Sequence, residues 1–469
     1  MRKVLLIALI LELMPMLTVC APTQIPAQTV KPNILYVFLD DADRKLMNRM
    51  TETRQQVAEE GVNFKDTSYP VPLCCPSRTS MQRGQYAHNT KVFSNEGASG
   101  GWDKFRAEGL QTSTYGTWVK RAGYRTGYFG KYINGYDAQA VPPGWDWWDV
   151  AYGKGLSLEQ FNRNGEIITR PEGPTFDAYV AGQAETWLDL VARKGPPFMG
   201  VVSLQAPHNP AEAPPWLEDN FSNAPFPKSP AYDEADVSDK PERIKNLPRV
   251  SEYDEGRMIR LWRDKLRSVE YADRQVIDML DILRKHGEFN STYIVVWSDN
   301  GFHMGEHRLV APNGIGDKDT AYNEDSAVPL WVRGPGIPHG VTSNELVSGI
   351  DLAPTFADMA GAGVPGFVDG RSFLPVSKGA PYRDYVYSAG GYSSGSVEVW
   401  QGVRTKNYSY TYYPATSEQE LYRLSDDPYQ LNNLMHTPTP GALDKASELR
   451  AKLVELQNCQ ADECRTKEE

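Results

Sequence analysis

The sequence predicts an α/β protein with a mostly parallel sheet sandwiched by helices, followed by a smaller C-terminal α+β subdomain with a short antiparallel sheet. Three observations lead to this prediction. Continuously apolar runs of strand length recur along the chain, helical patterns lie between them, and the texture changes after about residue 375. Strands that alternate with helices are typical of parallel sheets, whose strands are buried on both faces. A chain of 469 residues is also longer than a usual single-core domain.

The first predicted strand, Asn33–Leu39, is apolar almost throughout and runs directly into two aspartates. Such a run is typical of a central strand of a parallel sheet. The other predicted strands of the sheet are Arg125–Phe129, Phe198–Leu204, Tyr293–Trp297 and Val328–Val332.

Helices are predicted between these strands. Phe176–Lys194 and Asp264–His286 each carry an apolar stripe at helical spacing and are followed by a glycine. Asp351 is expected to cap a helix that extends to Met359. Residues 209–250 are rich in proline, aspartate and lysine without a clear period, and we expect them to run over the surface.

The texture after residue 375 indicates a second unit. Short strands are expected at Tyr385–Tyr387, Val397–Trp400 and Tyr408–Tyr410, before a charged helix near Leu443–Leu456. We therefore place the main domain at residues 32–375 and the C-terminal subdomain at residues 376–469.

The first 20 residues resemble a secretory signal peptide. Arg2 and Lys3 precede an apolar run from Val4 to Leu11 that is too short to span a bilayer. A buried N-terminal helix is the alternative, but no amphipathic pattern supports it. Cys20 is a second possibility, as the lipidated residue of a bacterial lipoprotein. Either way, the chain is expected to be exported.

The composition excludes some classes of function. Lys and Arg number 49 against 60 Asp and Glu, which gives a net charge of −11. Nucleic-acid binding is driven by basic surfaces, so no nucleic-acid partner is expected. No later segment is long enough to cross a membrane, so the mature chain is expected to lack a transmembrane span.

Polar side chains follow four of the predicted strands. The pairs are Asp40-Asp41, Gly130-Lys131, Pro207-His208 and Asp299-Asn300. In parallel sheets ligands bind outside the carboxyl ends of the strands, so one edge would gather all four pairs. The oxygen atoms of Asp40, Asp41, Asp299 and Asn300 suit a hard cation such as Ca²⁺ or Mg²⁺. The alternative is that these residues cap following helices.

A second motif is Leu73-Cys74-Cys75-Pro76-Ser77-Arg78. Pro76 and Ser77 are typical of a helix start, which places the two cysteines at an N-terminus that favours anions. Arg78 adds a fixed positive charge one turn into the helix. The alternatives for the cysteines are a structural disulfide or buried thiols. Lys131, His208 and Lys318 supply further positive groups that an oxyanion substrate needs, although each alone is more often a surface residue.

Together these motifs resemble the type I, formylglycine-dependent sulfatases, whose signature has the core Cys-x-Pro-Ser-Arg. The resemblance extends over nearly the whole mature chain, in the family's order. It implies an alkaline-phosphatase-like fold for the sulfatase catalytic domain, residues 32–375. The further matching segments are Gly130-Lys131-Tyr132, Pro207-His208-x-Pro210, Ser298-Asp299-Asn300-Gly301 and Glu420-Leu421-Tyr422.

The resemblance implies a role for each matching residue. Cys74 would be oxidised to formylglycine by a formylglycine-generating enzyme, and its hydrated aldehyde would attack sulfur and later expel sulfate. Arg78 would stabilise the hydrate, Lys131 and Lys318 would bind the sulfate, and His208 would protonate the leaving alcohol. The implied metal site holds one Ca²⁺, with Mg²⁺ as the alternative, on Asp40, Asp41, Cys74, Asp299 and Asn300.

The sequence is most similar to the N-acetylglucosamine-6-sulfatases and heparan 6-O-endosulfatases. Ile133 stands where many sulfatases have a histidine, within the run Lys131-Tyr132-Ile133-Asn134. The general base for sulfate release is therefore open, with His88 and His303 as candidates. This branch implies substrate contacts from His88, Asn89, Asn134 and His303.

The expected function is removal of sulfate from a sulfated sugar, most specifically 6-sulfated N-acetylglucosamine. The alternatives are an arylsulfatase acting on aryl sulfates, a phosphonate or phosphate monoesterase, and an inactive glycan-binding relative. The expected location is secreted, periplasmic, lysosomal or lipid-anchored at the cell surface. Cys459 and Cys464 are predicted to form a disulfide near the C-terminus.

Overall fold

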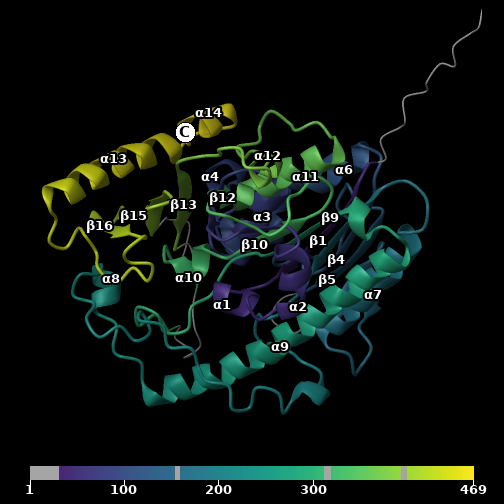
Figure 1. The fold of residues 1–469 in the computed structure, drawn as a ribbon, viewed down its shortest axis with the longest axis horizontal. Helices are drawn as coiled ribbons and strands as arrows, with labels where there is room; N and C mark the ends of the chain where they lie inside the picture. The colour runs from purple at the N-terminus through teal and green to yellow at the C-terminus, as the bar shows by residue number, and fades with distance from the viewer. Residues whose placement is uncertain (1–30, 154–158, 311–317, 392–398) are drawn as a thin grey trace, which may run out of the picture. The chain divides into compact units, whose positions relative to one another are not determined.

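In the part of the chain that the structure describes, ten strands form the main sheet, in the order β11-β2-β10-β9-β1-β8-β4-β5-β6-β7 (Figure 1). This computed structural model describes residues 31–153, 159–310, 318–391 and 399–469. The predicted signal peptide with Cys20 lies outside these ranges. Residues Pro32–Glu469 form one compact unit. The strands are β1 Asn33–Leu39, β2 Val62–Phe64, β4 Arg125–Gly130, β5 Trp147–Tyr152, β6 Gln160–Arg163, β7 Glu166–Thr169, β8 Phe198–Ser203, β9 Thr292–Ser298, β10 Leu330–Arg333 and β11 Val341–Ser343.

The centre of this sheet is parallel, as predicted. The strands β9, β1, β8, β4 and β5 pair in parallel, whereas β10 and β6 join the two sides antiparallel. Leu39 of β1 lies beside Ser298 of β9, so both strands end at the same level. Figure 1 shows β9, β1, β4 and β5 close together in the sheet. The carboxyl ends of the central strands therefore share one edge.

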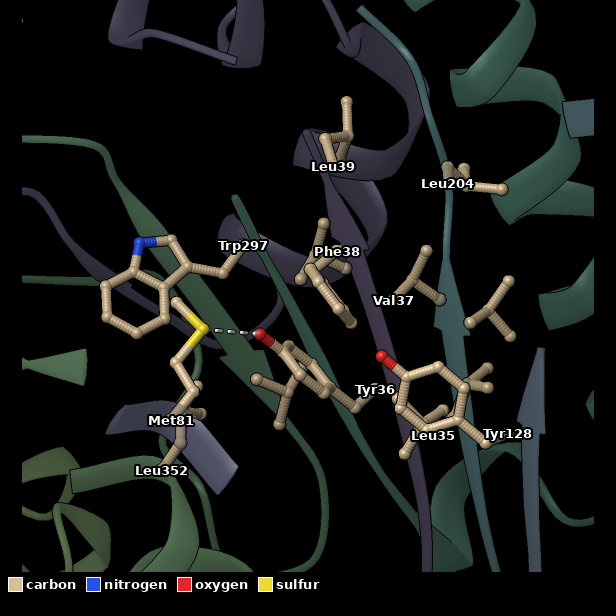
Figure 2. Packing of buried hydrophobic residues seen from close by; sticks show 14 of the residues in the cluster. Leu35, Tyr36, Val37, Phe38, Leu39, Met81, Tyr128, Leu204, Trp297 and Leu352 are labelled. Atoms are coloured by element: carbon tan, nitrogen blue, oxygen red, sulfur yellow. Dashed lines mark hydrogen bonds between the residues drawn. The ribbon is translucent and has the colours of Figure 1, made fainter. Parts of the chain in front are cut away.

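Helices cover both faces of the sheet. Tyr36 points to one face, where its hydroxyl lies 3.8 Å from the Met81 sulfur of α3 and its ring packs on Phe356 of α11 (Figure 2). Neighbouring side chains of a strand point to opposite faces, so Leu35 points to the other one. There Gly200 of β8 leaves room for Trp187 of α7, which would lie 2.9 Å from a Cβ atom.

The helices of the described residues vary widely in length. The long α9 lies against α7, and α11 lies against α3 and α6 (Figure 1). They are α1 Arg44–Met47, α2 Thr51–Thr53, α3 Cys74–Arg83, α4 Ala87–Thr90, α5 Gly101–Ala107, α6 Tyr115–Arg121, α7 Phe176–Val191, α8 Glu242–Lys245, α9 Glu252–Lys285, α10 Asn323–Ser326, α11 Leu352–Ala360, α12 Leu374–Ser377, α13 Pro440–Leu456 and α14 Asp462–Lys467. None of the described helices is both long and apolar enough to pass through a membrane.

The C-terminal part contains the predicted antiparallel sheet. Its four strands are β13 Val386–Gly390, β14 Trp400–Arg404, β15 Tyr408–Tyr413 and β16 Glu418–Arg423, paired in sequence order. Most of the predicted strand Val397–Trp400 lies outside the described residues. The helix α13 packs on this sheet through Leu449 and Leu453. The boundary at residues 375 and 376 stays a prediction.

Candidate active site

The carboxyl ends of β1 and β9 bring three buried carboxylates together. Asp40 and Asp41 follow β1, Asp299 follows β9, and their oxygen atoms lie within 4.8 Å of one another. Adjacent residues of a strand point to opposite sides, so the strand must break for both aspartates to face one point. Asp41 has a φ of 64°, and its amide N–H donates to Asp299 Oδ1 at 3.2 Å. This left-handed turn is the break.

The helix-cap alternative for these residues does not hold. The N-cap of α1 is Asp43, whose Oδ1 accepts from the Leu46 amide at 2.8 Å. The first helix after Asn300 in the described residues is α10, which begins at Asn323. Neither pair of polar residues therefore caps a helix.

The donor set fits a hard divalent cation. Asn300 Nδ2 donates to Asp41 Oδ1 at 2.7 Å, while its buried Oδ1 has no hydrogen-bond partner among the described residues. Burial and the nearby Asp40 raise the pKa of Asp299 to about 6. Close carboxylates resist joint ionisation unless positive charge is supplied. Oxygen donors alone, three of them anionic, are the ligands that Ca²⁺ or Mg²⁺ prefers.

Cys74 begins α3 beside these carboxylates. Its Sγ lies 3.7 Å from Asp40 Oδ1 and 2.9 Å from Lys318 Nζ. Cys74 and Cys75 are both buried and free, so the disulfide alternative is excluded. Burial raises the pKa of the Cys74 thiol to about 12. The helix begins at Cys74 rather than at Pro76, because Cys75 N–H finds an acceptor in Asn95 Oδ1 at 2.9 Å.

Arg78 connects the carboxylates to the neighbouring strand ends. Its Nε donates to Asp299 Oδ2 at 2.7 Å, and another guanidinium nitrogen lies 3.2 Å from Asp40 Oδ2. The remaining nitrogen donates to the Lys131 carbonyl at 2.8 Å and to Ser203 Oγ at 2.9 Å. All three nitrogens of the buried guanidinium therefore have partners, so the charge of Arg78 keeps a fixed position in the site.

Two lysines and a histidine surround the carboxylates. Lys131 Nζ forms an ion pair with Asp40, and Lys318 Nζ forms one with Asp41. His208 Nε2 lies 3.8 Å from Asp41 Oδ2. Burial alone would raise the pKa of Asp40, but Lys131, His208 and Arg78 lower it well below its usual range. The site thus concentrates positive charge in a chain that is acidic overall.

A cleft of about 540 Å³ opens beside these residues. Lys131 and His208 lie in its wall, which connects the cleft to the carboxylates. Asn134, the predicted substrate contact, and Trp102 also line it. The other lining residues are Asn95, Glu96, Gly97, Gly100, Gly101, Asp103, Tyr132, Ile133, Gly135, Tyr136, Ala151, Gly153 and Gln205.

His88 and Asn89 do not line this cleft, and their substrate contacts stay a prediction. His88 Nε2 lies 3.0 Å from the Cys459 carbonyl, and the ring stacks on Tyr86. Asn89 Nδ2 donates to the same carbonyl at 2.9 Å and to Asp369. Both residues connect α4 to the C-terminal segment instead.

His303 does not line the cleft either, and its substrate contact stays a prediction. It is buried, and its Nδ1 lies 3.0 Å from Asp325 Oδ1. Asp325 Oδ2 in turn accepts from the Thr320 amide and hydroxyl. This geometry gives His303 a role in fixing the segment after Lys318.

Sequence reasoning missed two residues that hold the His208 turn. Lys265 of α9 is buried and its Nζ donates to the Pro207 carbonyl at 2.9 Å. Asp177 of α7 accepts from the Gln205 amide at 2.6 Å and the Ala206 amide at 2.8 Å. Their position in the sequence could have identified them: each is a charged residue within the apolar stripe of a predicted helix. A charged side chain is rarely buried unless it is paired with another group.

Comparisons with known proteins relate this geometry to one family. A family model described as Sulfatase matches residues 32–362, and one described as N-sulphoglucosamine sulphohydrolase, C-terminal, matches residues 305–459. The N-acetylglucosamine-6-sulfatase of Capra hircus is 31% identical over 491 residues, which cover 93% of this chain and 85% of that protein.

Another relative is much longer than this chain. The extracellular sulfatase SULF-1 homolog of Drosophila melanogaster is 32% identical over 370 residues, which cover 76% of this chain and 32% of that protein. The chain thus spans about a third of that relative, and 49% of the related Caenorhabditis elegans protein.

A solved structure shows the same fold. It is a sulfated-sugar complex with D-glucosamine-2-N,6-O-disulfate, which is the substrate of that protein. The TM-score is 0.73 at 22% identity, over 93% of this chain and 98% of that one. The predicted alkaline-phosphatase-like fold is therefore confirmed. Because the Sulfatase model matches well over half of the chain, the protein belongs to the sulfatase family, whose members are hydrolases of sulfuric ester bonds.

Proposed function

We propose that the protein hydrolyses a sulfate ester on a sulfated sugar, with 6-sulfated N-acetylglucosamine as the expected substrate. The observation that carries this proposal is the position of Cys74. The signature cysteine lies against Asp40 and Lys318, and the cleft is reached through Lys131 and His208 of the same cluster. A nucleophile, a hard-cation site and fixed positive charges meet at one point, as sulfate-ester hydrolysis requires.

Asp40, Asp41, Asp299 and Asn300 would hold the Ca²⁺, with Mg²⁺ as the alternative and Cys74 directly beside them. When bound, the cation supplies positive charge to the sulfate oxygens. Arg78 keeps Asp299 and Asp40 in place, so the cation site is preformed on the protein's side. The buried oxygen of Asn300 supports this assignment, because it has no other partner among the described residues.

Formylglycine at Cys74, made by a formylglycine-generating enzyme, would supply a hydrated aldehyde as the nucleophile. Lys131 and Lys318 carry their ammonium groups next to Asp40, Asp41 and Cys74, where they would neutralise the sulfate oxygens. His208 Nδ1 lies 2.6 Å from the Asn209 carbonyl, which only accepts, so Nδ1 carries a proton. Nε2 would then give a proton to the leaving alcohol from the doubly protonated imidazolium, since in the neutral ring with Nδ1–H this nitrogen only accepts.

Two features support a sugar as the substrate. Relatives that cover most of this chain are N-acetylglucosamine-6-sulfatases at about 30% identity. Asn134 lines the cleft, where a side-chain amide suits the hydroxyl and amide groups of a sugar. Export through the signal at residues 1–20 would bring the enzyme to extracellular or lysosomal glycans.

The first test is the mass of the tryptic peptide from Asp66 to Arg78, taken from protein co-expressed with a formylglycine-generating enzyme. We expect the mass of an aldehyde in place of the Cys74 thiol. An active preparation whose Cys74 is wholly unmodified would refute the formylglycine mechanism.

The second test is turnover of 4-methylumbelliferyl sulfate, N-acetylglucosamine-6-sulfate and 4-methylumbelliferyl phosphate, each with and without EDTA. We expect EDTA-sensitive release of sulfate, fastest from the sugar. Preference for the aryl sulfate would indicate an arylsulfatase, and preference for the phosphate would indicate a phosphate monoesterase. Binding of the sugar without any turnover would indicate an inactive glycan-binding relative.

A further inference from the structure

The cleft wall beyond the cation site contains two carboxylates that the proposed reaction does not use. Glu96 and Asp103 both line the cleft, and both are exposed. Within the described ranges Glu96 has no ion pair, and Asp103 has an exposed one with Arg106 at 3.8 Å. A weak surface pair of this kind leaves most of the carboxylate charge in place.

The cleft wall also carries positive groups. Among the described lining residues, the groups that can carry positive charge are Lys131 and His208. Lys131 pairs with Asp40, and His208 lies 3.8 Å from Asp41. A sulfate ester bound at Lys131 and His208 leaves the rest of the sugar in the cleft that Glu96 and Asp103 also line. A second anionic group on that sugar would meet negative charge and no cation of the wall.

The hydrogen-bonding groups of the wall also favour particular substituents. Asn95 Oδ1 is already used by the Cys75 amide, and Asn134 Oδ1 is buried. Glu96 and Asp103 present exposed acceptors to the cleft, which pair with hydroxyl, amide N–H or ammonium donors. A sulfate group has acceptor oxygens only and satisfies none of them.

We infer that the protein selects sugars that carry one sulfate ester and otherwise hydrogen-bond donors, and that it rejects a second anionic group on the same sugar. This inference rests on the proposed function and specifies its substrate class. The carboxylates of the cleft wall repel a second sulfate group, and that group cannot donate hydrogen bonds to them. The selectivity therefore comes from weaker binding of the doubly charged sugar.

The test compares three sugars: N-acetylglucosamine-6-sulfate, glucosamine-6-sulfate and glucosamine-2-N,6-O-disulfate. We expect kcat/KM for each of the first two to exceed that for the disulfate by about tenfold, from two carboxylates at surface dielectric. The ratio should shrink in high salt, because exposed charges are screened. The double variant Glu96→Gln/Asp103→Asn should raise the relative kcat/KM of the disulfate by about fivefold.

Glu108→Gln is the matched control. Glu108 follows Asp103 at the end of α5, is exposed, pairs with Lys104 at 2.6 Å and does not line the cleft. Glu108→Gln removes one negative charge outside the cleft wall, against two within it in the double variant, and should leave the substrate ratio unchanged. Equal or faster turnover of the disulfate by the wild type would overturn the inference. So would a ratio that the double variant leaves where it was.

Binding separates this inference from the proposed function. Calorimetric titration of the Cys74→Ala variant with N-acetylglucosamine-6-sulfate and with the disulfate needs no turnover. Weaker binding of the disulfate supports the inference, and equal or tighter binding refutes it. Loss of turnover on all three sugars by the modified wild type would count against the proposed function alone.

Discussion

Arg78 shows why the residue types at the strand ends are not interchangeable. Its planar guanidinium meets Asp299 and Asp40 on two edges and the Lys131 carbonyl on the third. A lysine has one charged point and cannot reach all three. The resemblance implied that Arg78 stabilises the nucleophile, and the structure adds that it orders the carboxylates.

Replacing Cys74 by alanine should abolish turnover and leave the fold intact. The side chain is the proposed nucleophile, and a smaller apolar residue at this helix start leaves no buried polar group behind. Steady-state assays and thermal melts measure the two effects. Cys75→Ala is the matched control: its thiol is also buried and free, and its amide binds Asn95 rather than the carboxylates, so turnover should persist. A fully active Cys74→Ala enzyme would place the nucleophile elsewhere.

Asp299→Asn should lose both turnover and the effect of metal on stability. The amide keeps the shape but removes one of three anionic ligands and the ion pair with Arg78. For the wild type, Ca²⁺ at about a hundred times its Kd should stabilise the fold by about 2.7 kcal/mol. Thermal melts with Ca²⁺ or with EDTA measure this difference. An equal EDTA effect in both proteins would contradict the assignment of Asp299 to the metal site.

The order of the strands made it predictable that the four polar residues after β1 and β9 meet, whereas the surroundings of His88 could not be predicted in this way. Asp40, Asp41, Asp299 and Asn300 follow buried parallel strands, whose ends must meet. His88 follows the signature helix closely, and closeness in sequence suggested closeness in space. Gly84 ends α3 with a φ of 68°, and this left-handed turn directs the chain toward the C-terminal segment. Nothing in the residues around His88 encodes that direction.

At the scale of elements, the strands predicted from apolar runs agree well with the structure, whereas the predicted starts of some helices do not. The predicted helix at Asp264 in fact begins at Glu252, with Ser251 as its cap. Its first turns pack on the surface segment, where the Trp262 indole donates to the Pro225 carbonyl. Asp351 is the N-cap residue of α11 as predicted, but its side chain makes no capping hydrogen bond to α11 and instead accepts from the Ser348 amide, at the start of a preceding 3-10 turn. Polar first turns and preceding 3-10 turns have no clear apolar period, so pattern alone misses them.

Lys265→Met should lower kcat by about tenfold and leave KM within twofold. The helix α9 positions the His208 turn through the lysine bond to the Pro207 carbonyl. Methionine fills the same volume without the charge, so the fold should persist while His208 loses its fixed orientation. Lys285→Met, at the exposed end of the same helix, is the control. An unchanged kcat for Lys265→Met would mean that the turn is held by Asp177 alone.

At the scale of the whole molecule, the C-terminal part braces the active site as well as following it. The Trp400 indole donates to the carbonyl of Asp319, next to Lys318, at 3.0 Å. The Ala389 amide donates to the Pro70 carbonyl, shortly before the signature, at 2.9 Å. The sequence indicated the change of texture near residue 375, but these long-range contacts have no local signal in the sequence.

The predicted disulfide between Cys459 and Cys464 is confirmed, and it should contribute modestly to stability. Its sequence separation is 5, so the double variant Cys459→Ser/Cys464→Ser should lose about 2 kcal/mol of unfolding free energy. Denaturant titration measures this loss, and turnover should stay within twofold. A folded double variant without turnover would contradict the structural role given to His88, which contacts the Cys459 carbonyl.

The burial of Cys74 has a consequence for the order of events in biosynthesis. Its side chain is 1% exposed, at a helix start enclosed by strand ends, so another enzyme has no access to it in the folded chain. The proposed oxidation therefore belongs to the interval between synthesis and folding. Oxidation of Cys74 therefore competes with folding of the chain. A chain that folds before its Cys74 is oxidised stays inactive. Slower folding would raise the active fraction, and late addition of the maturing enzyme would not.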